Sequence, residues 1–247
     1  MALVANPPKN WDVRHVTRLP VLYLSCETEA LIGPKGQSSL RRLIRQDLAV
    51  DSVAFITSET GGAQPEIFHQ CGEGALARRL QSGMKARGFE VAVNGPRDSG
   101  LKLLAESMMQ LVPREVIELR LNTGMTSEHY RNIGLCLEAL RNQGVLLICL
   151  DRLETDSNSA SHSQPHDSYV RNLIRQWEDE QKWVKAMSKS GLSGTRPSTG
   201  QGNPVADPTL CVLNTAFSLG GMKAPQRLFG FSLNEDSQSL AGYGWMQ

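Results

Sequence analysis

The sequence of 247 residues contains no long hydrophobic run. Its longest candidate, Val145–Leu150, has the length of a strand, whereas a transmembrane helix needs about 20 apolar residues. The first residues lack the charged and then apolar layout of a signal sequence, and Pro7 and Pro8 come early. We therefore expect a cytoplasmic protein that makes no contact with a membrane.

The chain also lacks an excess of charge of one sign and any paired cysteine motif. It has 26 Lys and Arg against 25 Asp and Glu, a formal net charge of +1, so no nucleic-acid surface is expected. Its 5 cysteines are odd in number and none has CxxC spacing. This pattern argues against a disulfide framework or a structural zinc site, and it predicts free thiols that pack as small apolar side chains.

The common catalytic signatures are missing as well. There is no GxxxxGK[ST] phosphate loop, no GxGxxG after a strand, no GxSxG elbow and no HExxH zinc motif. His162 and His166 have HxxxH spacing, but Pro165 between them disfavours a helix that would bring both to one metal. His129 falls in the first turn of an expected helix, where we expect it to face solvent.

Apolar, β-branched runs alternate with segments of helical period. Strands are expected at 20–25, 53–57, 89–93, 115–121 and 145–150, and helices at 38–50, 73–87, 99–111, 127–143, 169–187 and 209–219, with a last strand near 227–233. This alternation predicts one three-layer αβα domain, residues 1–247, around a central, mostly parallel mixed sheet. Polar stretches at 155–168 and 188–206 are expected to be mobile loops.

Ligands of such sheets bind beyond the carboxyl ends of the strands. The residues that follow each expected strand are therefore the first candidates for chemistry. They are Cys26 and Glu27, Ser58 and Glu59, residues 94–100, residues 122–124 and residues 151–155.

The segment from Gly95 to Leu150 resembles the catalytic chains of the class III extradiol ring-cleavage dioxygenases, in particular the DOPA-extradiol-dioxygenase-like branch. The similarity rests on spacing and is strongest over residues 70–150. Matching positions are Asp98, Gly100, Pro113, His129, Tyr130, Gly134, Leu137, Leu140, Arg141 and Gly144. The resemblance implies a non-haem Fe(II) (or Zn) centre held by histidines, and opening of the ring of a catechol-type substrate with a further histidine as acid/base.

The positions that match the family's functional histidines carry other residues here. Those that match metal ligands are Cys26, Glu59, Thr155 and Asp207. The acid/base position is Ser99, next to Asp98, and the substrate pocket would include Glu27, Asn122 and Asp151. Arg152 would also oppose a divalent ion. Ordinary structural roles compete: a packed thiol for Cys26, a solvated rim for Glu59, and helix N-caps for Asp98 and Asp207.

The resemblance therefore predicts a diverged, catalytically inactive homologue that holds no metal and takes a small aromatic ligand. Three alternatives stay open. The substitutions could build a new, active metal site for an aromatic diol, the protein could be a pseudoenzyme that binds another ligand or a protein, or the chain could be an unrelated doubly wound enzyme. A thiolate–carboxylate set without imidazole suits Fe(II) dioxygenase chemistry poorly, which favours lost function.

Overall fold

The computed structural model describes a central sheet and helices that cover it. The described residues are 18–25, 41, 44, 49–59, 64–97, 100–109, 112–122, 124–151, 170–172, 174–176, 178–179, 182, 208–232 and 239–246. Within this part of the chain, no helix is long and apolar enough to cross a membrane.

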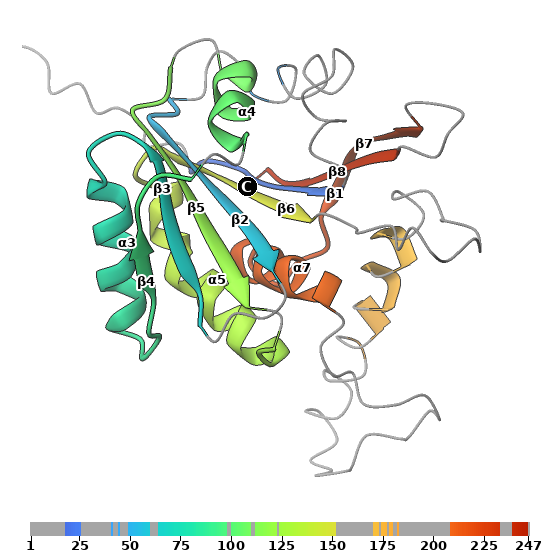
Figure 1. The fold of residues 1–247 in the computed structure, drawn as a ribbon. Coiled ribbons are helices and arrows are strands. Elements are labelled where there is room, and N and C mark those ends of the chain that lie inside the picture. Colours follow the sequence, from blue (N-terminus) through green and yellow to red (C-terminus); the bar gives the residue numbers. More distant parts are fainter. Residues whose placement is uncertain are drawn as a thin grey trace, which may run out of the picture.

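One mixed sheet of eight strands forms the centre of the molecule (Figure 1). In chain order the strands are β1 (Val21–Ser25), β2 (Ser52–Glu59), β3 (Glu66–Cys71), β4 (Ala92–Asn94), β5 (Glu115–Asn122), β6 (Val145–Asp151), β7 (Gln226–Ser232) and β8 (Ser239–Trp245). Their spatial order is β4-β3-β5-β2-β6-β1-β8-β7. The central strands β5, β2, β6 and β1 are mutually parallel, as expected from the alternating pattern, whereas β3 and β8 run antiparallel to their neighbours in this block.

Helices cover both faces of the sheet. They are α3 (Ala75–Lys85), α4 (Leu101–Met108), α5 (Ser127–Arg141) and α7 (Pro208–Leu219). One core cluster joins α3, α5 and α7 to one face, and a second joins α4 to the other (Figure 1). Alternate residues of each central strand feed the two cores: on β6, Leu147 points to α5 and α7, and Leu146 to the side of α4. The expected three-layer αβα architecture is confirmed.

The helices α5 and α7 pack closely because small residues face each other. A Cβ on Gly134 would lie 2.6 Å from the Thr215 carbonyl oxygen and 2.7 Å from the Ser218 Cβ. Two hydroxyls of α7 donate to carbonyl oxygens of α5: Ser218 to Arg131 at 2.6 Å and Thr215 to Tyr130 at 3.2 Å. The two helices therefore form one rigid layer beneath the central strands.

Several predicted boundaries need correction. The expected strand 89–93 is β4, only Ala92–Asn94, and the strands β3 and β8 were not anticipated. The helix expected from residue 99 begins at Leu101, and its N-cap is Gly100 in a left-handed conformation without a side-chain cap. Gly100 thus occupies the N-cap position, and Asp98, interpreted from the sequence as an N-cap, lies outside the described residues. The prediction for α5 is confirmed, because Thr126 caps it by accepting from the His129 backbone N–H.

A buried arginine ties three elements together at the amino end of β1. Arg141, the last residue of α5, is 1% exposed. Its Nε donates to the Leu19 carbonyl at 2.6 Å and its Nη1 to the Leu219 carbonyl at 2.9 Å. Burial lowers the pKa of this guanidinium to about 10, so it stays charged at neutral pH.

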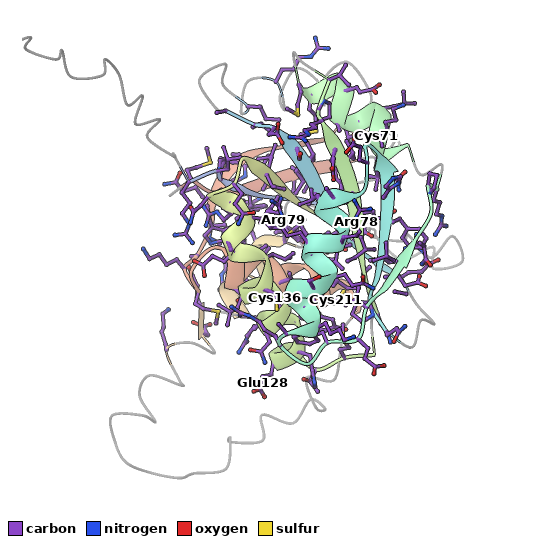
Figure 2. All side chains as sticks on the ribbon, turned by 90° about the vertical axis from the view of Figure 1, so that its left-hand side faces the viewer. Cys71, Arg78, Arg79, Glu128, Cys136 and Cys211 are labelled. Carbon is purple, nitrogen blue, oxygen red and sulfur yellow. The ribbon has the colours of Figure 1, made fainter. Side chains whose placement is uncertain are left out.

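We expect Arg141→Ala to destabilise the fold. The substitution leaves two buried carbonyl groups without these donors and removes a well-packed side chain, a loss of about 3 kcal/mol in the free energy of unfolding. Urea unfolding followed by circular dichroism measures it. The matched control is Arg79→Ala, at an exposed position of α3 (Figure 2), where a change within about 0.5 kcal/mol is expected. Equal effects of the two substitutions would contradict this role.

Candidate functional site

The carboxyl ends of β1, β2, β5 and β6 meet at one edge of the sheet. The register pairs Ser25 with Asp151, and Glu59 with Asn122. Of the residues proposed from the sequence as site residues, the structure describes Glu59, Asn122 and Asp151. Cys26, Glu27, Asp98, Ser99, Thr155 and Asp207, like Arg152, His162 and His166, lie outside the described residues. Their convergence on one site stays a prediction.

Asp151 is buried at the end of β6, beneath the α5–α7 layer. It is 1% exposed, and the Tyr23 hydroxyl donates to its Oδ2 at 2.6 Å. Tyr23 itself is fully buried on the neighbouring strand β1. A buried carboxylate needs hydrogen-bond donors, and the Tyr23 hydroxyl supplies one to Asp151. The carboxylate is therefore buried at the carboxyl edge of the sheet.

Two cysteine thiols lie close enough to Asp151 to sense its charge. Burial, and less strongly the charge of Asp151, raises the pKa of Cys149 on β6. Burial raises the pKa of Cys211, in the first turns of α7, to about 12, although a hydrogen bond with Ser58 acts in the opposite direction. We call Tyr23, Ser58, Cys149, Asp151 and Cys211 the Asp151 cluster. Its thiols are protonated at neutral pH and cannot act as nucleophiles.

Asn122 shapes the loop that follows β5. Its Oδ1 accepts from the Gly124 N–H at 2.9 Å, and its carbonyl oxygen accepts from the Tyr130 hydroxyl at 2.6 Å. The same hydroxyl accepts from the Met125 N–H at 3.2 Å. Burial raises the pKa of Tyr130 to about 12, so the phenol remains a donor at neutral pH. Asn122 is thus held in a turn at the edge of the site.

On the other face of the sheet, the face of α4, Glu59 is paired with arginines. Its carboxylate forms a hydrogen-bonded ion pair with Arg120 of β5, and Arg97 approaches it to 3.9 Å. The Arg120 side chain is only 11% exposed, and its guanidinium also lies 3.8 Å from Glu66 and 3.7 Å from Glu118. We call these five charged residues the Arg120 cluster.

Aromatic and hydroxyl groups fix this cluster in place. The guanidinium carbon of Arg120 lies 4.3 Å from the centre of the Phe68 ring, which places the cation over the aromatic face. Thr57 donates to Glu118 at 2.8 Å. Glu118 is 3% exposed, so its carboxylate depends on these partners. If Arg120 moved away from Glu59, the buried Glu118 would therefore lose its positively charged partner.

Glu59, the one expected ligand position that the structure describes, does not suit the ferrous ion that the resemblance implies. Glu59 occupies one of the expected ligand positions, but its carboxylate is already bound by Arg120 and has Arg97 nearby. A divalent ion there would have to displace a guanidinium and would then be repelled by it at close range. Across the described ranges, no three His, Cys, Asp or Glu side chains are grouped as metal ligands.

Sequence reasoning missed Tyr23 and Arg120, the two partners that define these clusters. Both lie two residues before the end of a strand, on the same face as the terminal residue. The two-residue period of a strand was therefore an available signal for both. Neither residue follows a strand, so the rule that looks beyond the carboxyl ends of strands does not reach them.

Comparison with known proteins identifies the fold and no activity. No family model and no curated protein matches the chain. The fold is similar to the crystal structure of an uncharacterized protein, JW3007, from Escherichia coli K12, with a TM-score of 0.57 and 15% sequence identity. The similarity covers 92% of this chain and 99% of that one. At this identity the likeness establishes the shared α/β architecture.

We expect the thiols of the Asp151 cluster to be inert in the folded protein. At neutral pH, iodoacetamide should label Cys149 and Cys211 on the order of a hundredfold more slowly than the half-buried Cys71 and Cys136 (Figure 2). Even at a pH of about 9, Cys211 should still be labelled more slowly than Cys71, because a pKa of about 12 leaves only a small fraction of its thiol ionised there.

Peptide mass spectrometry after timed quenching reads each cysteine separately. The same labelling in urea serves as the control, in which all of these thiols should react alike. If Cys211 in the folded protein reacts as fast as Cys71, the thiol is not buried beside Asp151 as described.

Proposed function

We propose that the protein is a diverged relative of the extradiol dioxygenases that binds a small aromatic ligand without opening its ring. The observation that carries the proposal is the pairing of Glu59 with Arg120. At a position where the family pattern has a metal-binding histidine, this chain has a carboxylate that is occupied by a guanidinium. Chemistry that needs two substrate oxygens and dioxygen on one metal ion has no counterpart in that arrangement.

The protonation states near the edge support binding over catalysis. An enzyme that deprotonates a catechol needs a base whose pKa lies near neutrality. Tyr130 and Cys211 have pKa values of about 12. Asp151 is buried and accepts a hydrogen bond from the Tyr23 hydroxyl. These three groups are suited to donating or accepting fixed hydrogen bonds rather than to moving protons.

The aromatic class of ligand follows from the family resemblance and from the place of the site. The carboxyl edge of a parallel sheet is where small molecules bind in this fold class.

We expect no stoichiometric iron after anaerobic equilibrium dialysis against ferrous ion, and no yellow ring-opened product from a panel of catechols in air. Metal analysis by mass spectrometry and visible absorbance measure the two outcomes. The same catechols should raise the melting temperature of the protein if the edge binds an aromatic ligand. One iron per chain together with a ring-opened product would contradict the proposal.

Two matched variants test whether the positive charge of Arg120 opposes a metal ion at Glu59. Arg120→Gln removes the positive charge beside Glu59, and Arg120→Lys keeps it. Because the guanidinium is what opposes a cation, uptake of ferrous ion or Zn²⁺ should increase in Arg120→Gln and stay at the wild-type level in Arg120→Lys. Circular dichroism confirms that both variants are folded before metal is added.

A further inference from the structure

A cavity of about 570 Å³ lies at the opposite end of the sheet from the candidate site. The register pairs Val21 with Trp245 and Leu22 with Gly244, so this cavity adjoins the amino end of β1. The Asp151 cluster adjoins its carboxyl end. The described lining residues are Arg18, Gly220, Gly221, Lys223, Ala224, Gln226, Gly244, Trp245 and Met246. The cavity is therefore separate from the edge that the resemblance singles out.

Trp245 gives the cavity a rigid aromatic wall. The residue is 5% exposed, its indole Nε1 donates to the Lys223 carbonyl at 2.6 Å, and its ring meets Phe217 edge-on with centroids 5.6 Å apart. A Cβ on Gly220 would lie 2.2 Å from the indole ring, so only glycine allows this ring to close on the end of α7. The wall is thus formed before any ligand arrives.

The end of α7 beside the cavity does not present bare carbonyl groups. The Gly221 N–H bonds to the Ser218 carbonyl at 3.0 Å and the Met222 N–H to the Phe217 carbonyl at 2.8 Å. Arg141 satisfies the Leu219 carbonyl. The two backbone hydrogen bonds form the usual C-cap of a helix that ends in glycine. They cap the partial negative charge that would otherwise repel an anion at a helix carboxyl end.

The charged side chains that line the cavity are positive. Arg18 and Lys223 are its only charged residues among those the structure describes, and both are exposed. Arg18 forms an ion pair with Glu138. Within the described ranges, no carboxylate lies within ion-pair distance of Lys223. The rim therefore offers an ammonium group that no described carboxylate neutralises, beside a wall formed by Trp245 and Met246.

We infer that this cavity is a second ligand site, which takes a small aromatic anion such as a carboxylate or sulfonate on one or two rings. Its volume lies in the usual range for sites of small molecules, about 300–1,000 Å³. The ring of the ligand packs against the exposed Ala224 and Met246 and against the small part of Trp245 that faces the cavity. Its acid group pairs with Lys223 at the rim, where the ammonium keeps contact with water.

Two fluorescent probes of similar shape test the inference, 8-anilinonaphthalene-1-sulfonate and its uncharged analogue N-phenyl-1-naphthylamine. The sulfonate should bind saturably with one site per folded chain. Lys223→Gln should weaken its binding about fivefold and leave the uncharged probe unaffected, because only the ion pair is lost. Ala224→Trp should abolish binding of both probes by filling the cavity from its exposed rim.

Lys102→Gln, an exposed lysine on α4 at the far face of the sheet, is the matched charge control and should leave both probes unaffected. Gln226→Trp, also at an exposed position of the rim, replaces Ala224→Trp if the latter does not fold by circular dichroism. Sulfonate binding that survives the tryptophan substitution would overturn the inference. Equal weakening by Lys223→Gln and Lys102→Gln would overturn it too. Neither result depends on the Arg120 variants.

Discussion

The central strands of the sheet are buried on both faces, and this constraint governs the charged side chains that are buried in them or packed against them. A charge removed from water must find a partner within the protein. Asp151 has the Tyr23 hydroxyl, Arg141 has two backbone carbonyl groups, and Glu118 has Thr57 with the guanidinium of Arg120 nearby. The polar groups of the fold are thus largely committed to one another before any ligand is considered.

The same pairing makes Glu59 a poor ligand for a metal ion. An enzyme site keeps ligands that are held in place by outer partners but left open toward the ion. Here the partner of Glu59 is itself a cation, and Phe68 and Glu118 hold that cation in place. Moving Arg120 would cost the pairing of a buried carboxylate. The contacts that stabilise the sheet around Arg120 would therefore also oppose a divalent ion at Glu59.

The elements of the fold could be predicted from the sequence where local patterns agree with the tertiary packing. The apolar run of β6 and the capped helix α5 were predicted within a few residues because burial and capping are readable from neighbouring positions. β3 was missed because Glu66, His69 and Gln70 interrupt its apolar pattern, and it pairs antiparallel with a distant strand. Likewise, α3 has no side-chain cap of its own. Its first N–H groups bond to Glu115 of β5, a contact that only tertiary structure provides.

For the candidate site, spacing located Glu59, Asn122 and Asp151 at strand ends but could not reveal what they touch. The ion pair between Glu59 and Arg120 joins residues 61 positions apart in the chain. A double-mutant cycle with Glu59→Gln and Arg120→Met, read by urea unfolding, tests most directly whether this pair is formed in solution. We expect a favourable coupling of about 0.5–1 kcal/mol, the range for a partly exposed pair. Strictly additive effects would mean that Glu59 is free for another partner, and the account of this edge would fail.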